Sequence, residues 1–441
     1  MIIDINADTL KLIKNPDFSE YAQTYVQILA DFMDRITETG IGLAPCNSSA
    51  DRLERVSKLE EKGARIRSEG KSIYANWISP ACLACRRGNN SQTFFISLKC
   101  HRNCFFCFNP NQEGYNFYLH HKRDVFRELE QIATNGDILE HIALTGGEPL
   151  LYKQDTLRFF DFVKNLFPHS YTRLYTCGDH ADEETLKALK ASGLDEIRFS
   201  LRIHDSDKAQ KYTLDRIAVA KKYIPCVMVE MPVLPDSGEN MRCLLRELDR
   251  LEIAGINLLE FCYPINNASV YNQKGYLIKS PPFKILYDYW YAGALPIDGS
   301  EDLSLELLEF ALEEGLTLGI HYCSLENKHT SQIFLQNSQE RPPEMFYFSK
   351  KDFFLKSAKV FGEDIPPVRR ILQKRRRSKY KFNRHGKYLE FHVKDIQALK
   401  NLKVEIGIAS SIIEKRSQGS VIRELKVDLT TPQQFELSTD V

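Results

Sequence analysis

The chain has 441 residues, of which 59 are Lys or Arg and 59 are Asp or Glu, so its formal net charge is zero. This length exceeds that of a usual single domain and predicts a large core domain with smaller additions. The balanced charge excludes an overall field that would draw the protein to nucleic acid or to an anionic membrane, so any such role needs a local patch.

The chain carries no signal for a membrane or a secretory route. Its first stretch, MIIDINADTLKLIK, contains acids and no long apolar segment, and no run approaches the roughly 18 apolar residues of a spanning helix. Five of the eleven cysteines lie between residues 82 and 107, which favours metal ligands in a reducing compartment over disulfides. We therefore expect a soluble, cytoplasmic protein that has no membrane partner.

Two helical patterns open the chain. Apolar residues recur at helical spacing in FSEYAQTYVQILADFMDRI, from residue 18 to 36, and a charge-rich helical pattern follows from about Asp51 to Ser68. Residues 1–80 are therefore predicted to form a helical N-terminal cap.

The middle of the chain alternates between short apolar runs and helical patterns. The runs are TFFISL, HIALT, YTRLYTC, EIRFSL, CVMVEMPV and INLLEFCYPI. Near-continuous apolar strands that alternate with helices predict parallel βα units, hence an α/β fold with an open or closed βα barrel within residues 81–330. Ligands of such a fold are expected at the carboxyl ends of its strands.

Residues 331–441 differ in pattern and predict a small, basic α+β appendix. Between Val368 and Tyr388 the chain has ten Lys or Arg, no acid and interleaved aromatic residues. Such a run could follow a phosphate backbone, dock an acidic polypeptide or leader peptide, or form a solvated charged face. The sequence leaves these alternatives open.

The stretch SLKCHRNCFFCFNP carries Cys100, Cys104 and Cys107 in the spacing C-x3-C-x2-C at the end of the first strand of the barrel. Thiolates suit zinc, copper(I) or iron–sulfur clusters, and three of them around a four-iron cluster leave one iron without a protein ligand. Zinc fits less well because it would need a fourth ligand, and His101 is awkwardly adjacent to Cys100. Alternatively, the three cysteines are unliganded thiols that bind no metal.

A second motif, LTGGEPLL, begins at the end of the second strand. Gly146 and Gly147 let the backbone approach a ligand closely, Glu148 offers an acceptor for an ammonium group, and Pro149 fixes the turn. Alone this motif predicts only a turn, but its place after the strand makes it a candidate binding loop.

The cysteine motif, with Phe106 directly before its last cysteine, and the following LTGGEPLL resemble the signature of the radical S-adenosylmethionine (radical SAM) superfamily. The chain looks similar to uncharacterised members related to pyruvate formate-lyase activating enzymes. The resemblance implies a partial (βα)6 TIM-like barrel of the radical SAM type in which Cys100, Cys104 and Cys107 bind a 4Fe-4S cluster. The amino and carboxylate groups of SAM would chelate its unique iron.

The resemblance also implies which residues contact SAM, whereas no catalytic residue follows from the sequence. Contacts to the amino group are expected from the GGEP turn, and further contacts from the ends of the third and fourth strands. The predicted cofactor-binding residues are Phe106, Gly146, Gly147, Glu148, Thr176 and Ser200.

A second set of thiols surrounds the barrel sequence. Cys82 and Cys85 form a C-x2-C in SPACLACRRG, and GIHYCS places His321 and Cys323 at a later strand end. Three cysteines, with His321 or an open position, could hold a second iron–sulfur cluster or zinc. A redox dithiol and unliganded thiols are the alternatives.

The family resemblance implies an oxidoreductase reaction. A low-potential donor such as flavodoxin or ferredoxin would reduce the cluster, and SAM would break into methionine and a 5′-deoxyadenosyl radical that abstracts hydrogen from a substrate. We expect the substrate to be a protein or peptide, with tRNA or a small molecule as alternatives. A different class of function is also considered, in which the chain is a non-catalytic protein that binds a metal and nucleic acid.

Overall fold

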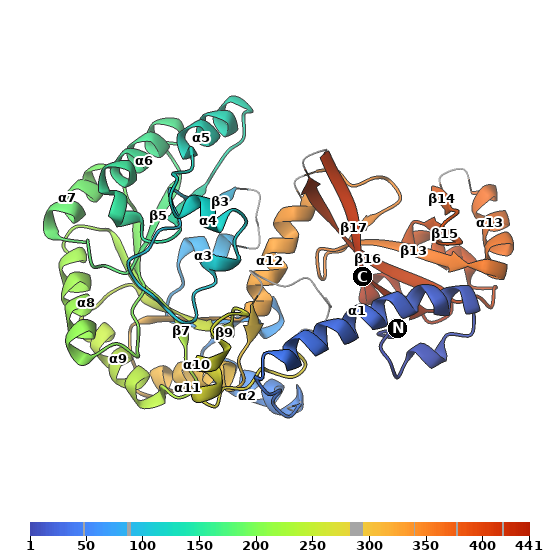
Figure 1. The fold of residues 1–441 in the computed structure, drawn as a ribbon, viewed down its shortest axis with the longest axis horizontal. Helices are drawn as coiled ribbons and strands as arrows, with labels where there is room; N and C mark the ends of the chain where they lie inside the picture. The colour runs from blue at the N-terminus through green and yellow to red at the C-terminus, as the bar shows by residue number, and fades with distance from the viewer. Residues whose placement is uncertain (47–48, 86–89, 283–293, 339, 376–377, 417–418) are drawn as a thin grey trace. The chain divides into compact units, whose positions relative to one another are not determined.

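The computed structural model describes residues 1–46, 49–85, 90–282, 294–338, 340–375, 378–416 and 419–441 (Figure 1). It divides into two compact units. The core unit comprises residues 41–282 and 294–328, and the terminal unit comprises residues 1–40 and 329–441. The division at residues 80 and 330 stays a prediction. No helix of the described residues is long and apolar enough to cross a membrane.

A nine-stranded sheet forms the centre of the core unit, in the order β1-β2-β11-β8-β7-β6-β5-β4-β3. The strands are β1 (Arg65–Arg67), β2 (Ser72–Ala75), β3 (Ser91–Phe95), β4 (His141–Thr145), β5 (Tyr171–Thr176), β6 (Glu196–Phe199), β7 (Cys226–Val233), β8 (Gly255–Glu260) and β11 (Gly319–Cys323). Strands β3 to β8 pair in parallel with their chain neighbours, and β11 pairs in parallel with β8. The six predicted parallel strands are therefore confirmed, and the described pairs leave β1 and β3 at the two edges of the sheet.

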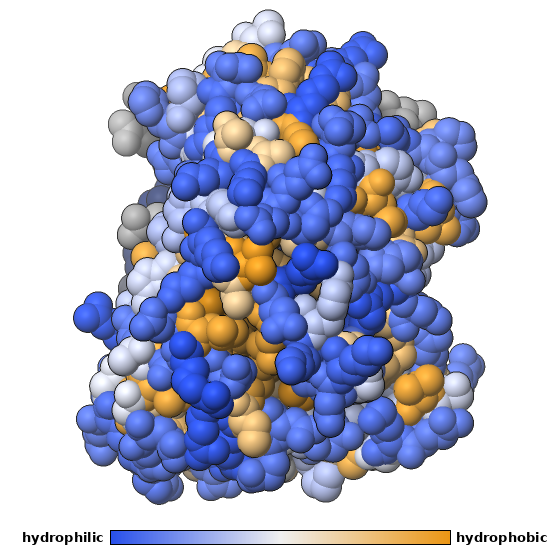
Figure 2. Space-filling model, turned by 90° about the vertical axis from the view of Figure 1, so that its left-hand side faces the viewer, coloured by the Kyte–Doolittle hydropathy of each residue, from blue (hydrophilic) through white to orange (hydrophobic). Residues whose placement is uncertain are grey.

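Helices connect the parallel strands, and Figure 1 shows α5 to α9 in an arc outside them. Their bounds are α5 (Val125–Thr134), α6 (Lys153–Leu166), α7 (Glu183–Ala191), α8 (Asp207–Ala220), α9 (Gly238–Arg250) and α11 (Ser300–Glu313). Helix α9 buries Met241, Leu244, Leu245 and Leu248, which share one helical face. On the face drawn in Figure 2, hydrophilic residues predominate around a hydrophobic patch near the centre. The predicted α/β class of this unit is thus confirmed.

The segment before β3 differs from the predicted helix. Helix α2 (Ser49–Glu61) ends before Gly63, where a φ of 103° turns the chain, and Arg65–Arg67 then pairs with β2 as a strand. The predicted continuation of the helix to Ser68 is therefore wrong, because the charged pattern after Glu61 belongs to an edge strand. The remaining elements of the core unit are α3 (Pro80–Ala84), α4 (Tyr115–Tyr118), β9 (Cys262–Tyr263), α10 (Ala268–Gln273) and β10 (Leu295–Pro296), while α12 (Leu325–Ser338) crosses the division between the units.

The terminal unit contains an antiparallel sheet in the order β14-β15-β13-β16-β17, with β12 beside β13. Its elements are β12 (Tyr347–Phe348), β13 (Leu355–Phe361), α13 (Ile365–Lys374), β14 (Tyr380–Asn383), β15 (Tyr388–Phe391), β16 (Ile406–Arg416), β17 (Gly419–Thr430) and α14 (Leu437–Asp440). Ala358 and Val360 of β13 share a core with Val368 and Leu372 of α13. This sheet with its packed helix has the α+β character predicted for the appendix.

The N-terminal helix α1 (Pro16–Glu38) packs on the same antiparallel sheet. Asn15 caps the helix by accepting a hydrogen bond of 3.1 Å from the N–H of Phe18. Phe18 in turn stacks on Phe361 of β13, with ring centroids 4.6 Å apart. The first part of the apolar stripe predicted for this helix, including Phe18 and Tyr25, is therefore buried against the terminal sheet.

The basic run from Val368 to Tyr388 is distributed over α13, β14 and the segments beside them. Two of its residues, 376 and 377, lie outside the described part of the chain. Arg375 lies 3.4 Å from a carboxylate oxygen of Asp395, and Lys379 lies 3.3 Å from one of Glu344. Part of the positive charge is thus balanced by acids of the same unit, and the roles of the run stay predictions.

Candidate functional site

The three cysteines of C-x3-C-x2-C lie on the loop after β3. The strand ends at Phe95, so Cys100 lies farther into the loop than the run TFFISL predicts. Burial raises the pKa values of the Cys100 and Cys107 thiols, and the negative charge of Cys104 raises both further. The three thiols are therefore close enough to repel one another when ionised.

This donor set fits an iron–sulfur cluster. Thiolates are the ligands that such clusters take from proteins, and the three sulfurs gather on one loop. A cationic metal centre would relieve their mutual repulsion and stabilise their ionised forms. The residues therefore suit the cluster that the sequence motif predicts.

Asparagine side chains fix the cysteine loop against neighbouring strand ends. Asn109 Nδ2 donates to the carbonyl of Gly146 after β4 at 2.6 Å, and Asn111 Nδ2 donates to the carbonyl of Pro264 after β9 at 2.9 Å. Asn267 Nδ2 donates to the carbonyl of Phe105 at 3.1 Å. The loop is thus held from both sides by side chains that the sequence did not single out.

The two glycines of the GGEP turn let it lie against the start of the cysteine loop. A Cβ atom on Gly147 would lie 2.0 Å from the carbonyl oxygen of Lys99, and one on Gly146 would lie 2.6 Å from that of Ser97. The N–H of Gly147 donates to Ser97 at 3.0 Å. Close backbone packing therefore explains both glycines, whereas their contact with SAM stays a prediction.

Glu148 is buried and joins the ends of β4 and β5. Its Oε1 accepts hydrogen bonds from the N–H of Leu150 at 3.0 Å and from the hydroxyl of Thr176 at 2.8 Å. Its Oε2 accepts one from the N–H of Cys177 at 2.7 Å. Since a carboxylate oxygen can accept two hydrogen bonds, Oε2 keeps capacity for an ammonium donor with respect to the described residues.

The other predicted cofactor residues lie at the same edge of the sheet. Ser200 follows β6, is exposed, and donates its N–H to the carbonyl of Thr176 at 2.8 Å. The Phe106 ring meets those of Phe105 and Phe261 edge-on, with centroid distances of 5.1 and 6.0 Å. The structure thus brings the predicted cysteines, the GGEP turn, Thr176 and Ser200 to the carboxyl ends of β3 to β6.

Sequence reasoning missed a cluster that ties the cysteine loop to the end of β5. Asp179 accepts hydrogen bonds from Arg102 Nε at 2.5 Å and pairs with His101 Nε2 at 2.6 Å. Although burial opposes it, these hydrogen bonds lower the pKa of Asp179 to about 2. The position of Asp179 just after a strand end was the signal that could have found it.

The same cluster contains a group of possible metal ligands. In the described part of the chain, ligand atoms of His101, Cys177 and Asp179 lie within 4.8 Å of one another. Because Asp179 already binds the guanidinium of Arg102, an added cation would meet a positive charge. The cluster is therefore better suited to orient the loop than to hold an ion.

The structure also gathers the second thiol set. Cys82 lies on α3, Cys85 ends that helix, and Cys323 ends β11. Burial raises the pKa of Cys323 to about 12, and the negative charges of Cys85 and Cys82 contribute to this increase. Asn257 of β8 contacts both Cys82 and His321, so segments far apart in the sequence come together here. Whether the three thiols bind a metal stays a prediction.

Comparisons with known proteins agree with this geometry. A sequence model described as "Radical SAM superfamily" matches residues 94–248. A protein of Methanocaldococcus jannaschii, provisionally named a glycyl-radical enzyme activating enzyme, is 25% identical over 259 residues. That alignment covers 57% of this chain and 64% of the relative, so this chain spans less than two thirds of the relative's length.

Solved structures give weaker likenesses. Streptococcus suis SuiB bound to its precursor peptide SuiA is 15% identical with a TM-score of 0.40, over 72% of this chain and 67% of that chain. Coproporphyrinogen III oxidase (HemN) of Escherichia coli, described as a radical SAM enzyme, is 14% identical with a TM-score of 0.35, over 55% of this chain and 58% of that chain. The matched residues 94–248 include the three cysteines, the GGEP turn and the strand ends described above, so this part of the chain carries a radical SAM domain.

Proposed function

We propose that this chain is a radical SAM enzyme that holds a 4Fe-4S cluster on Cys100, Cys104 and Cys107 and binds SAM beside it. The observation that carries this proposal is the placement of three cysteines on one loop whose backbone packs directly against the GGEP turn. When bound, the cluster and SAM would supply one-electron cleavage of SAM to methionine and a 5′-deoxyadenosyl radical, which takes a hydrogen atom from the substrate.

The chain's own residues orient and shield the site. Three hydrogen bonds fix the orientation of the Glu148 carboxylate. Its Oε2 atom can therefore accept a further hydrogen bond from an amino group in one defined position. Phe105 lies between the rings of Phe106 and Tyr271, at centroid distances of 5.1 and 5.4 Å. These aromatic rings keep water from one side of the cysteine loop.

The substrate that we propose is a protein or peptide. The support is the name of the Methanocaldococcus jannaschii relative, since a glycyl-radical enzyme activating enzyme acts on a polypeptide. The basic run would suit an acidic segment of such a partner. A flavodoxin or ferredoxin is the proposed electron donor, because the reduction needs a low potential.

The cofactor part of the proposal is tested by anaerobic reconstitution with iron and sulfide, followed by an assay of SAM cleavage to 5′-deoxyadenosine under a strong reductant. We expect cleavage in the wild type and in Cys243→Ala, because Cys243 is an exposed residue of α9. Cys104→Ala is expected to lose both iron and cleavage. Equal cleavage by Cys104→Ala and Cys243→Ala would contradict the assignment of the cluster ligands.

The substrate class is tested with hydrogen isotopes. Extracts of cells grown in deuterated medium are separated into protein, RNA and small-molecule fractions and added to the reconstituted enzyme. Deuterium is expected in 5′-deoxyadenosine when the protein fraction is added, because the radical abstracts hydrogen from its substrate. Transfer from the RNA or the small-molecule fraction alone would instead overturn the choice of a polypeptide.

A further inference from the structure

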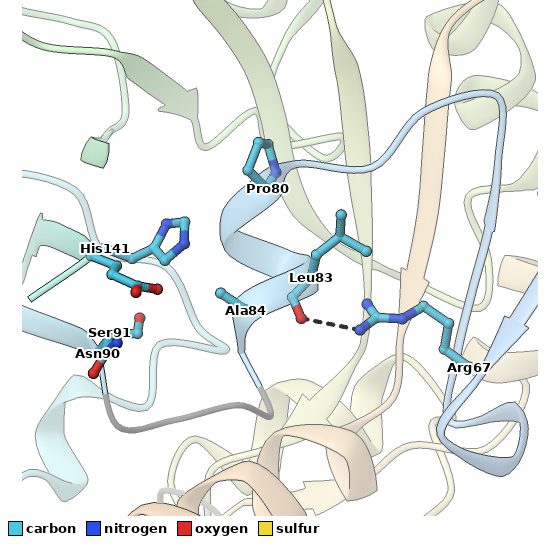
Figure 3. Close-up of a pocket in the computed structure, with 8 residues that line it drawn as sticks. Arg67, Pro80, Leu83, Ala84, Asn90, Ser91 and His141 are labelled. Carbon is cyan, nitrogen blue, oxygen red and sulfur yellow. Dashed lines mark hydrogen bonds between the residues drawn. The ribbon is translucent and has the colours of Figure 1, made fainter. Parts of the chain in front are cut away.

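Helix α3, which carries the C-x2-C motif, lies between the two edge strands of the core sheet (Figure 3). At the end of β1, Arg67 donates to the carbonyl oxygens of Cys82 at 3.2 Å and of Leu83 at 3.1 Å. A cavity of about 340 Å³ lies between α3 and the residues Ser91 of β3 and His141 of β4, and Arg67 also lines it. The backbone of the motif is thus anchored to one edge of the sheet and faces the other.

The Cys82 side chain meets buried donors from the interior of the sheet. Its Sγ accepts hydrogen bonds from Arg198 Nη2 of β6 and from Asn257 Nδ2 of β8, both at 3.4 Å. Arg198 is buried and carries a positive charge directly beside this sulfur. The surroundings of this sulfur therefore favour a thiolate, the form that binds metals.

Cys323 brings a third sulfur from a different part of the chain. It ends β11, is buried, and its Sγ accepts a hydrogen bond from Asn327 Nδ2 at 3.4 Å. Asn257, which donates to Cys82, also bonds to His321, and Cys323 follows His321 by two residues on the same face of β11. Cys85 follows Cys82 by three residues at the end of α3, so all three cysteines belong to segments that meet here. N–H donors directed at ligand sulfurs are the outer contacts that tune iron–sulfur centres.

His321 is held in a way that leaves no ring nitrogen for a metal. Its Nε2 shares a hydrogen bond of 2.9 Å with the hydroxyl of Ser72, and its Nδ1 shares one of 2.9 Å with Asn257 Oδ1. A closed tetrahedral zinc site would need a fourth ligand of this kind. Three thiolates around a four-iron cluster need none, because one iron can keep an open position.

We propose that Cys82, Cys85 and Cys323 bind a second iron–sulfur cluster, a 4Fe-4S centre with one iron that has no protein ligand. Arg198, Asn257 and Asn327 donate hydrogen bonds to its cysteine sulfurs, and His321 positions Asn257. The site joins α3 to β11, so the cluster links the segment before β3 to the strand that follows β8.

The proposal is tested by counting iron, acid-labile sulfide and zinc per chain after anaerobic reconstitution. We expect about eight iron and eight sulfide in the wild type, since each 4Fe-4S cluster holds four of each. The control Cys243→Ser is expected to match the wild type. Cys82→Ser/Cys323→Ser is expected to keep about four iron and to retain SAM cleavage, because the first cluster is intact.

A complementary variant separates this inference from the proposed function. Cys100→Ser/Cys104→Ser/Cys107→Ser removes the first site, and we expect it to keep about four iron with the electron paramagnetic resonance signal of a reduced 4Fe-4S cluster. The iron content of this variant reports on the second site alone. It does so even if no protein cleaves SAM, and even if Cys82→Ser/Cys323→Ser fails to fold. Loss of all iron in this variant, or a zinc ion that only Cys82→Ser/Cys323→Ser loses, would overturn the proposal.

Discussion

The carboxylate of Glu148 accepts a hydrogen bond of 2.7 Å from the backbone N–H of Cys177, so the turn after β4 is bound to the end of β5. The backbone N–H of Glu148 itself donates to the carbonyl of Lys99 at 2.9 Å. One buried residue therefore holds the cysteine loop and two strand ends in a fixed arrangement. A cofactor site built on such contacts is ordered before its ligand arrives.

Glu148→Gln is expected to lower the free energy of unfolding of the core unit by about 1–3 kcal/mol. The amide keeps one oxygen that can accept hydrogen bonds, but its NH2 group cannot accept one from Leu150, Thr176 or Cys177. At least one buried hydrogen bond is therefore lost. Urea unfolding followed by circular dichroism measures the change. The matched control is Glu184→Gln, at an exposed position of α7, and equal unfolding of both variants would refute the structural role of Glu148.

Gly147→Ala is expected to prevent iron incorporation while the core unit stays folded. The added Cβ would lie 2.0 Å from Lys99 O, so the turn must move away from the cysteine loop. Iron per chain after reconstitution is the measurement. In the control Gly238→Ala, the Cβ meets Leu303 Cδ1 at 3.5 Å, an ordinary contact, and a normal iron content is expected. A full complement of iron in Gly147→Ala would show that this close packing is not needed.

Asp179→Asn is expected to destabilise the protein by about 1–2 kcal/mol at pH 7. Burial alone would raise the pKa of Asp179, but the hydrogen bonds from Arg102 and His101 outweigh it and lower the pKa to about 2. A carboxyl whose pKa is depressed on folding contributes stability above its unfolded pKa, about 3.9. This contribution is lost as the pH falls from about 4 toward 2.

The measurement for Asp179→Asn is urea unfolding of variant and wild type between pH 7 and pH 2.5. The difference in unfolding free energy should shrink below about pH 4, since protonated Asp179 then resembles the amide. Asp161→Asn, at an exposed position of α6, controls for the loss of one surface charge. A difference that stays constant across this pH range would exclude the carboxylate as its source.

Lys359→Met is expected to destabilise the terminal unit by about 3–5 kcal/mol, because it leaves the carboxylate of Glu424 without its buried counter-charge. The Tyr21 hydroxyl, which donates to Glu424 at 2.6 Å and accepts from Lys359 at 2.8 Å, would lose one partner as well. Hydrogen exchange of β13 and β17 measures the effect on this unit alone.

The control for Lys359→Met is Lys400→Met. Lys400 lies 3.5 Å from Glu436 in an exposed ion pair. Exposed pairs contribute little, so we expect a change of less than about 1 kcal/mol. Similar exchange rates in the two variants would contradict a special role for the buried pair.

Local patterns in the sequence predicted the strands and the first site well. The apolar runs from HIALT to INLLEFCYPI became parallel strands, because a strand buried on both faces leaves a strong signal in a few residues. The cysteine motif and GGEP each lie within one loop that follows a strand, so the sequence placed them at the carboxyl ends of β3 and β4. The sequence pattern therefore predicted those features that depend on neighbouring residues in the chain.

Contacts between distant segments could not be predicted in this way. The stripe on α1 indicated a buried face but not that Phe18 would stack on Phe361. Asp179 was missed because its role depends on Arg102 in another loop. The helix was predicted to continue to Ser68, but residues 65–67 form a strand that pairs with β2. Each of these results depends on the partner segment and not on the local pattern.

The pairing of α1 with a sheet formed much later in the chain has a consequence for synthesis. Ile3 pairs with Leu429 through two backbone hydrogen bonds, and Phe18 needs β13. At about 5–20 residues per second, a ribosome takes on the order of 20–80 s to add the residues between α1 and the end of β17. Until β13 and β17 have been made, the nascent chain presents an uncovered apolar helix, so a holding chaperone at the ribosome would have its binding site in the first forty residues.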